Sequence, residues 1–317
     1  MQLLAAPDKF RGTLSAREAA TAIATGARRA GWSAVELPLA DGGEGTLDVL
    51  GGGNRRTTVT GPLGDPVDAA WRLENDGAAL IEAAQACGLS LAAGPERNDP
   101  LGATSRGVGE LVAAAVAEGA SRIVVAVGGV ASTDGGVGAV EALPSRLPPL
   151  DVACDVEARF LDAADVFAPQ KGATPEQVRI LRERLAKLAV PDVPGSGAAG
   201  GLAGGLAAVG ARLIPGFDFV AGRLDFDAQL AAADLVVTGE GLVDATSLAG
   251  KVVGRVLARA AAAGVGALIL AGDVAAGSPF DAVSLVARYG AERALAESAE
   301  CLGELAETVL ATRRTGP

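Results

Sequence analysis

Six short phrases recur along this chain, and each places a carboxylate in or beside a glycine-rich turn where an apolar run ends. They lie at residues 6–12, 41–45, 128–136, 153–155, 239–241 and 271–273. In proteins that alternate strands and helices, ligands bind at the carboxyl ends of the strands, and glycine lets the backbone approach them closely. Acidic side chains gathered there suit Mg²⁺ and a phosphoryl group in transfer. Gly and Asp also favour ordinary turns, so a single phrase would indicate only a turn.

The chain has no histidine among its 317 residues. This excludes Ser-His-Asp hydrolysis, Cys-His nucleophilic chemistry and every histidine-ligated metal site. Proton transfer must therefore use Asp, Glu, Lys, Tyr or water. Carboxylate chemistry with an oxygen-liganded cation is the class that remains easiest.

The net charge and the distribution of apolar residues indicate which partners and which compartment to expect. The formal net charge of −11 argues against nucleic acid, because phosphate contacts need clustered Lys and Arg. No apolar run reaches the ~18 residues of a membrane span, and the first residues lack the basic start of a signal peptide. The three cysteines show no metal or redox spacing, and they are Cys87, Cys154 and Cys301. We expect a cytoplasmic protein that binds neither nucleic acid nor membrane.

The first 45 residues read as a strand-helix-strand unit. An apolar strand at 2–6 precedes a helix that begins near residue 16, where Ser15 and Glu18 form a capping box. A second strand at 34–39 leads into the acidic turn at 41–45. Both acidic turns are therefore predicted at the same edge of a parallel sheet.

The middle of the chain predicts a mixed sheet, and the last third returns to alternating strands and helices. In the middle we expect strands at 57–60, 67–73, 78–83, 123–127 and 150–153, with helices at 107–118 and after Thr174. In the last third we expect strands at 234–238, 267–271 and 283–287, with helices at 247–263 and 291–312.

This pattern predicts an α/β protein in which a doubly wound parallel sheet domain is interrupted by a second, mixed α/β domain. The first domain is expected to comprise residues 1–58 and 228–317, and the inserted domain residues 59–227. A cleft between two such domains is the expected place for a small-ligand site.

Two nucleotide-binding motifs match poorly. Residues 195–200 fit GxGxxG, but the preceding residues 191–194 make a poor strand, so a closely packed helix is the better interpretation. Lys251 follows a glycine without the upstream glycine or the Ser/Thr of a P-loop, which excludes a Walker motif.

Three other segments suit anions, although each has an ordinary structural explanation. Backbone amides and hydroxyls in the loop 128–136 could hold phosphate, or the loop could be only a turn. Lys171 precedes a predicted helix, where phosphate would also bind, or it could be a solvated loop lysine. Lys9 and Arg11 could bind a substrate carboxylate, or belong to a surface charge cluster.

The ordered phrases taken together resemble the bacterial glycerate kinase family, of the type without a P-loop. They cover nearly the whole chain and lie at 7–16, 39–46, 128–136, 154–156, 167–174, 197–202 and 238–244, with Ser247 and 250–251. The resemblance implies a flavodoxin-like domain interrupted by a second α/β domain. It also implies phosphorylation of D-glycerate that depends on ATP and Mg²⁺ and usually gives 2-phosphoglycerate.

Residue roles follow as hypotheses from this resemblance and from the acidic and basic phrases. Arg11, helped by Lys9, would bind the substrate carboxylate. The catalytic candidates are Asp8, Asp41, Glu44 and Asp155. The metal candidates are Asp134, Asp155 and Glu240. The nucleotide and phosphate candidates are Gly128, Gly129, Ser132, Thr133, Lys171 and Lys251. Which acid accepts the proton, and whether the protein is a monomer or a homodimer, stay open.

The chain also departs from the usual family phrases. Lys9 and Arg11 replace a small hydroxyl and a lysine, and Val130 and Thr133 replace a serine and an asparagine. The stretch 157–161 is shortened and altered. Two alternatives therefore stand beside the kinase: a catalytically impaired protein that binds glycerate or nucleotide, and a kinase for another small hydroxy acid.

Overall fold

The computed structural model describes residues 1–10, 12–248 and 251–314 of the chain. The chain divides into two compact units, which are residues 1–41 with 217–317 (unit 1) and residues 42–216 (unit 2). The sequence placed the corresponding boundaries at 58/59 and 227/228. Among the described residues, no helix combines the length and apolarity needed to cross a bilayer.

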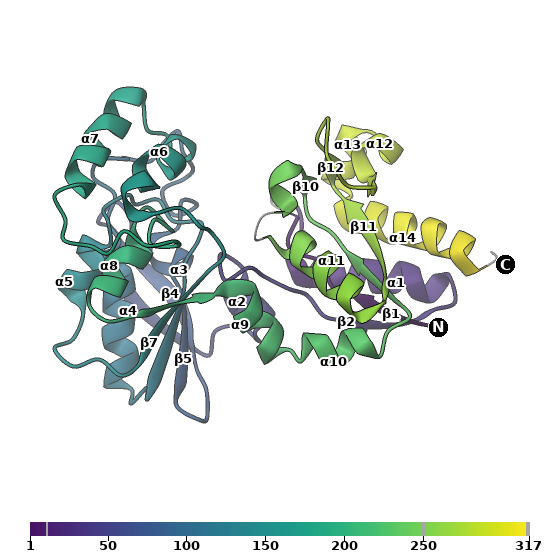
Figure 1. Cartoon of the computed structure of the whole chain (residues 1–317), viewed down its shortest axis with the longest axis horizontal. Coiled ribbons are helices and arrows are strands. Elements are labelled where there is room, and N and C mark those ends of the chain that lie inside the picture. The colour runs from purple at the N-terminus through teal and green to yellow at the C-terminus, as the bar shows by residue number, and fades with distance from the viewer. Residues whose placement is uncertain (11, 249–250, 315–317) are drawn as a thin grey trace. The chain divides into compact units, whose positions relative to one another are not determined.

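Unit 1 is built on a five-stranded parallel sheet (Figure 1). Its strands in spatial order are β2 (Ser33–Glu36), β1 (Gln2–Ala5), β9 (Leu235–Thr238), β11 (Gly266–Ala271) and β13 (Ala282–Ser284). Counted along the unit, this is the order 2-1-3-4-5 of flavodoxin-like folds. The predicted doubly wound parallel sheet is confirmed.

The helices of unit 1 bury alanine-rich faces against this sheet and against each other. The first helix, α1 (Ala16–Arg29), begins at the predicted capping box of Ser15 and Glu18 and packs against α14 (Ser298–Arg314) (Figure 1). The other helices are α9 (Gly216–Arg223), α10 (Phe226–Ala231), α11 (Val252–Ala263), α12 (Leu285–Tyr289) and α13 (Ala291–Ala296). A short parallel pair, β10 (Leu242–Val243) and β12 (Asp273–Val274), and a 3₁₀ turn (Ala245–Leu248) complete it.

Unit 2 contains the predicted mixed sheet, with six strands where five were predicted. Its strands in spatial order are β3 (Arg55–Thr60), β4 (Pro66–Leu73), β5 (Ala78–Glu82), β6 (Arg122–Ala126), β7 (Leu150–Cys154) and β8 (Arg212–Pro215). The first three strands pair antiparallel and the last four pair parallel. Only β8 had no counterpart among the predicted strands.

The helices of unit 2 are mostly short. They are α2 (Thr46–Val49), α3 (Ala84–Cys87), α4 (Arg106–Ala117), α5 (Val137–Ala142), α6 (Ala163–Phe167), α7 (Pro175–Leu185) and α8 (Leu202–Ala208), with 3₁₀ turns at Phe160–Asp162 and Pro169–Lys171. The predicted cap at Thr174 opens α7, and the glycine-rich stretch after residue 195 leads into α8. The sheet core includes Trp71, and a smaller cluster joins Phe160 to Leu181 and Leu185.

One predicted strand is wrong in its second half. Residues 283–287 were expected as a strand, but β13 ends at Ser284 and α12 begins at the next residue. The Ser284 side chain accepts a hydrogen bond from the Ala287 amide at 3.0 Å, and this N-terminal cap starts the helix. A local hydrogen bond therefore overrides the apolar run that suggested the strand.

Candidate functional site

The acids of unit 1 lie where its sheet changes winding direction. Asp8 follows β1, and Glu240 follows β9, which is the neighbouring strand. The Asp8 amide donates a hydrogen bond to the Gly239 carbonyl oxygen at 2.9 Å, so the two segments stay paired beyond the strands. In an open parallel sheet with this strand order, ligands bind outside the carboxyl ends of these two strands.

The surroundings of Asp8 disfavour the ionised form of its carboxyl group. The side chain is buried, and burial raises the pKa of Asp8 to about 7. The Lys9 ammonium group lowers this pKa in part, whereas the charges of Asp41 and Glu240 raise it further. The Lys9 amide also donates a 2.7 Å hydrogen bond to Asp8 Oδ1. Three of the predicted acids are thus electrostatically connected within unit 1.

Glu240 is a second buried carboxylate with spare hydrogen-bonding capacity. Burial raises its pKa, although the hydroxyl of Ser247 and the charge of Lys251 oppose this. Lys251 Nζ lies 3.6 Å from Glu240 Oε2 and 3.8 Å from Asp244 Oδ1. Glu240 Oε1 is buried and has no hydrogen-bond partner among the described residues. An unpaired buried carboxylate oxygen is costly, which marks this atom as a place for a ligand.

A glycine beside this acid is required by close packing. A Cβ built on Gly239 would lie 1.8 Å from the Leu270 carbonyl oxygen, a distance that no side chain tolerates. The neighbouring strands β9 and β11 therefore meet at this point with no room for a side chain. The glycine of the predicted phrase sets the backbone path that carries Glu240.

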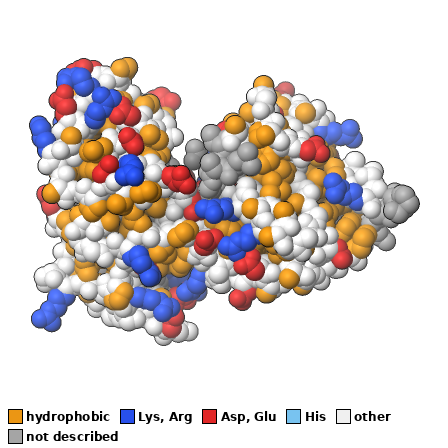
Figure 2. Space-filling view, in the orientation of Figure 1, with side chains coloured by type: hydrophobic (Ala, Val, Ile, Leu, Met, Phe, Trp, Pro, Cys, Tyr) orange, Lys and Arg blue, Asp and Glu red, His pale blue; other side chains and the backbone are white. Residues whose placement is uncertain are grey.

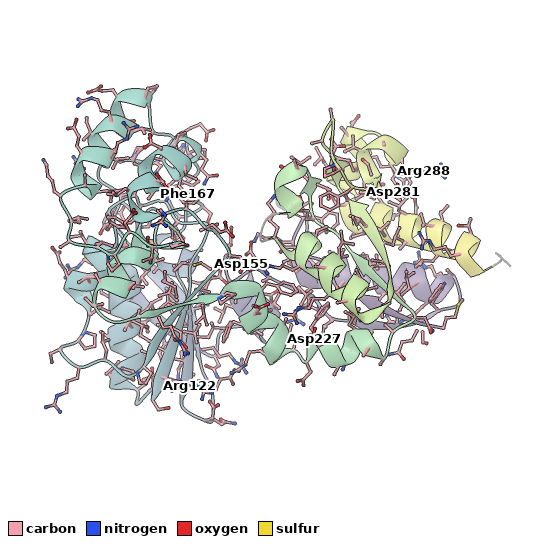
Figure 3. The ribbon with its side chains drawn as sticks, in the orientation of Figure 1. Arg122, Asp155, Phe167, Asp227, Asp281 and Arg288 are labelled. Atoms are coloured by element: carbon pink, nitrogen blue, oxygen red, sulfur yellow. The ribbon has the colours of Figure 1, made fainter. Side chains whose placement is uncertain are left out.

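In unit 2 the turn at 42–45 lies against the carboxyl ends of the sheet strands. A Cβ built on Gly128 would lie 2.8 Å from Gly43 Cα, and one on Gly129 would lie 3.0 Å from Glu44 Oε2. Glu44 is therefore beside the start of the loop 128–136. Asp155 follows β7 at the same edge, as labelled in Figure 3, and Arg122 begins β6 at the opposite edge.

A residue that the sequence analysis missed holds this turn in place. Glu82 ends β5 and is only 2% exposed. Its Oε2 accepts hydrogen bonds from the amides of Gly45 at 3.1 Å and Leu47 at 2.9 Å. A carboxylate at the end of an otherwise apolar strand was the available signal, but no glycine follows it directly.

Two predicted metal candidates of unit 2 use carboxylate oxygens to bind backbone groups. Asp134 Oδ2 accepts hydrogen bonds from the Ser105 amide and hydroxyl at 2.9 and 2.8 Å and from the Gly138 amide at 3.2 Å. Its Oδ1 accepts one from the Gly136 amide at 3.1 Å. Asp155 Oδ1 accepts one from the Gly216 amide at 3.0 Å. Asp134 therefore fixes the loop at the start of α5.

The loop 128–136 turns its two hydroxyl residues inward. Ser132 and Thr133 are buried, as is Lys171, whereas Gly129 is exposed. Lys171 Nζ donates hydrogen bonds to the Ser132 carbonyl oxygen at 2.5 Å and to Thr133 Oγ1 at 3.4 Å. Three predicted phosphate ligands are thus brought together, but the ammonium group of Lys171 binds the other two residues.

The predicted residues therefore fall into separate groups. Unit 1 brings together Asp8, Asp41, Glu240 and Lys251, and unit 2 brings together Glu44, Gly128 and Gly129. Arg11 lies outside the described residues. Within the described part of the chain, no three His, Cys, Asp or Glu side chains are arranged to hold a metal ion by themselves. On the face shown in Figure 2, basic and acidic side chains are interspersed.

Comparisons with known proteins find relatives that match over most of the chain. The chain matches the glycerate kinase family over residues 3–149 and 145–314. It is 43% identical to an uncharacterized protein of Mycobacterium tuberculosis, over 98% of this chain and 91% of that protein. It is 38% identical to the glycerate 2-kinase of Escherichia coli, over 80% of each chain. A crystal structure from Salmonella typhimurium, of a protein assigned as glycerate kinase 2, has 35% identity and a TM-score of 0.79, covering 100% of this chain and 99% of that one.

Proposed function

Because the chain belongs to the glycerate kinase family, we propose that it transfers the γ-phosphoryl group of ATP to D-glycerate and forms 2-phosphoglycerate. The observation that carries this proposal is the pair of buried acids, Asp8 and Glu240, at the switch point of the flavodoxin-like sheet. Phosphoryl transfer needs mainly positioning and neutralisation of charge, for which such a site is suited.

The acids of unit 1 divide the work in this proposal. Asp8 accepts the proton of the substrate hydroxyl while the hydroxyl oxygen bonds to the γ-phosphorus and ADP leaves with the bridging oxygen. Asp41 orients the hydroxyl, and the cations Lys9 and Arg11 bind the substrate carboxylate. The position of Asp8 beyond β1, buried and paired with the β9 segment, supports its part.

The donor set of unit 1 fits Mg²⁺ that arrives with the nucleotide. Mg²⁺ usually takes one or two carboxylates, substrate phosphates and several waters rather than an all-protein cage. Glu240, with its buried unpartnered Oε1, offers such a carboxylate. Bound there, the ion would neutralise charge on the phosphates. Asp134 is better suited to positioning, because both its oxygens are already hydrogen bonded.

In unit 2 the glycine loop is proposed to bind the nucleotide phosphates through its backbone. Gly128 is half-buried and Gly129 is exposed at the carboxyl end of β6, and their amides would be the donors to phosphate. Glu44, held beside Gly129, stays a proposed catalytic residue, and Asp155 a proposed catalytic or metal-binding one. We also propose that the protein acts in the cytoplasm on this small-molecule substrate.

The test is release of ADP with D-glycerate, followed by identification of the phosphorylated carbon by ³¹P and ¹³C NMR. We expect turnover with D-glycerate and a 2-phosphorylated product. Replacing Asp8 with Asn should lower kcat about 100-fold or more, the usual effect of losing a general base. The exposed Asp281, labelled in Figure 3, gives the matched control Asp281→Asn, which should leave kcat unchanged.

Two results would overturn the proposed activity, and a third would overturn only the role of Asp8. ATP binding without turnover would favour the catalytically impaired protein. Faster turnover of tartronate or a sugar acid than of D-glycerate would favour a kinase for another hydroxy acid. Turnover that survives Asp8→Asn would remove Asp8 from the proton transfer.

A further inference from the structure

Lys171 is a cation in an unusual place. It ends the 3₁₀ turn Pro169–Lys171, four residues after Phe167, which Figure 3 labels at the end of α6. Its side chain is only 4% exposed. Lysine is almost never this buried unless its ammonium group has partners. A phosphate at the protein surface could not reach this group without displacing the residues that cover it.

The ammonium group is directed to one segment of the glycine loop. Its hydrogen bond to the Ser132 carbonyl oxygen is short, 2.5 Å, and a longer one reaches Thr133 Oγ1. The backbone of Lys171 is tied to the same segment, because Asn98 Nδ2 donates to the carbonyl oxygens of both Lys171, at 2.9 Å, and Ala131, at 3.2 Å. Both ends of the residue therefore hold positions 131–133.

The opposite side of this contact is closed by a glycine. A Cβ built on Gly200 would lie 2.3 Å from the Ser132 carbonyl oxygen and 2.8 Å from Lys171 Nζ. Gly200 also accepts a hydrogen bond from the Gly135 amide at 3.1 Å. The glycine stretch that resembled a dinucleotide fingerprint thus serves to let the backbone approach the lysine and the loop.

We propose that Lys171 is a positioning residue rather than a phosphate ligand: its buried ammonium group fixes the Ser132–Thr133 segment so that the exposed part of the loop, at Gly129, can bind nucleotide. This inference deepens the proposed function and rests on it. Without the ammonium group, the Ser132 carbonyl oxygen would lose its charged donor and the loop its fixed shape.

The geometry also implies a dependence on pH. Burial lowers the pKa of Lys171 to about 8, while the charge of Asp134 in the loop acts to raise it. Burial raises the pKa of Cys87 to about 12, so this thiol stays neutral over the relevant range. As pH rises, Lys171 therefore loses its proton before the neighbouring Cys87 does. Nucleotide affinity should weaken as pH rises through about 8.

The first experiment measures ATP affinity of the full chain by calorimetry. Lys171→Met keeps an unbranched side chain, shorter by one atom, and removes the ammonium group with its charge. We expect its Kd to rise about 10- to 100-fold, in line with the loss of a charged hydrogen bond. The exposed Lys187 gives the matched control Lys187→Met, whose Kd should not change. Between pH 7 and 9 the wild-type Kd should rise, and that of Lys171→Met should stay flat.

The second experiment separates positioning from direct contact. The chain has four lysines, Lys9, Lys171, Lys187 and Lys251, so [¹³C]lysine labelling gives four Cε signals. The signal absent from Lys171→Met should titrate near pH 8 in the free chain, and the backbone amide signals of residues 129–133 should shift with the same midpoint before any ATP is added. By linkage with the expected 10- to 100-fold change in Kd, ATP should raise this midpoint by about one to two units. Loop amides that do not follow the titration in the free chain would mean that the ammonium group does not fix the loop, and would overturn the proposal.

The outcomes distinguish this inference from the proposed function. A wild-type chain that binds no ATP would overturn both. ATP binding with equal Kd in the wild type and Lys171→Met would overturn the positioning role alone. A melting temperature of Lys171→Met within a few degrees of the wild type, alongside weakened ATP binding, would support it, because a merely structural lysine would change both together.

Discussion

At the scale of single residues, the buried carboxyl of Asp8 carries a free-energy cost that depends on pH. Its pKa rises from an ordinary value of 3.8 to about 7 on folding. Between these two values the folded chain holds the proton more tightly than the unfolded chain does. Stability from this group is therefore greatest below about pH 4 and falls as pH rises towards 7, by an amount on the order of 4 kcal/mol.

Replacing Asp8 with Asn should remove this cost while abolishing its proposed chemistry. In metal-free buffer we expect Asp8→Asn to melt several degrees above the wild type at pH 8 and close to it at pH 4. Calorimetric scans at both pH values measure this, with Asp281→Asn as the exposed control. Equal shifts at the two pH values would mean that folding does not raise the pKa of the Asp8 carboxyl.

The sequence predicted which residues are candidates better than it predicted their burial and their neighbours. Local phrases pointed to Asp8 and Glu240, because a carboxylate after a strand and beside glycine is visible in the sequence. Their mutual electrostatics depend on β1 and β9 being neighbours, although they are far apart in the chain. Lys171 was predicted as a phosphate ligand from its place before a helix. Its burial comes from residues near 132 and 200, which no local pattern connects to it.

At the scale of elements, α1 and α14 pack so closely that small residues are needed between them. A Cβ built on Gly26 of α1 would lie 2.1 Å from the Gly303 carbonyl oxygen and 2.9 Å from the Ala306 side chain. The backbone of α1 at Gly26 therefore lies directly against the backbone and a side chain of α14. The small residues at this contact, Gly26, Gly303 and Ala306, are what allow the two helices to approach this closely.

This packing predicts opposite effects for one substitution at two helical glycines. Alanine favours a helix over glycine by roughly 1 kcal/mol. Gly222 in α9 is exposed and has nothing within 4 Å of a built Cβ, so Gly222→Ala should stabilise by up to about 1 kcal/mol. Gly26→Ala should destabilise by about 1–3 kcal/mol, because overpacking outweighs propensity. Urea unfolding measures both, and a stabilised Gly26→Ala would contradict the predicted clash.

Elements with strong local signals were the ones that the sequence placed well. The capping boxes at Ser15 and Thr174 are local hydrogen bonds, so α1 and α7 begin where predicted. The strand β8 is short, and its burial depends on pairing with β7, so it gave no independent pattern. The strand predicted at 283–287 was wrong in its second half because the apolar run alone does not reveal the cap. That cap is the hydrogen bond that the Ser284 side chain accepts, and it starts a helix there.

At the scale of the whole molecule, the inserted unit 2 is a continuous segment with its own sheet and core. Its two ends meet, since a Cβ built on Gly42 would lie 2.6 Å from Gly216 Cα. Adjacent ends are what an insertion into another domain requires, and they are typical of segments that can fold on their own. The sequence predicted the insertion from the change in element pattern, but the ends are defined only by these contacts.

Residues 42–216 alone should therefore fold and unfold in one cooperative transition. Asp134, whose charge raises the pKa of Lys171, and the hydrogen-bond partners Ser132 and Thr133 all belong to this unit. In [¹³C]lysine-labelled fragment we expect the Lys171 signal to titrate near pH 8, as in the full chain, while Lys187 serves as the exposed reference. Circular dichroism in urea measures the transition. A fragment without cooperative unfolding, or a Lys171 midpoint near the ordinary 10.5, would show that the rest of the chain is needed to bury this lysine.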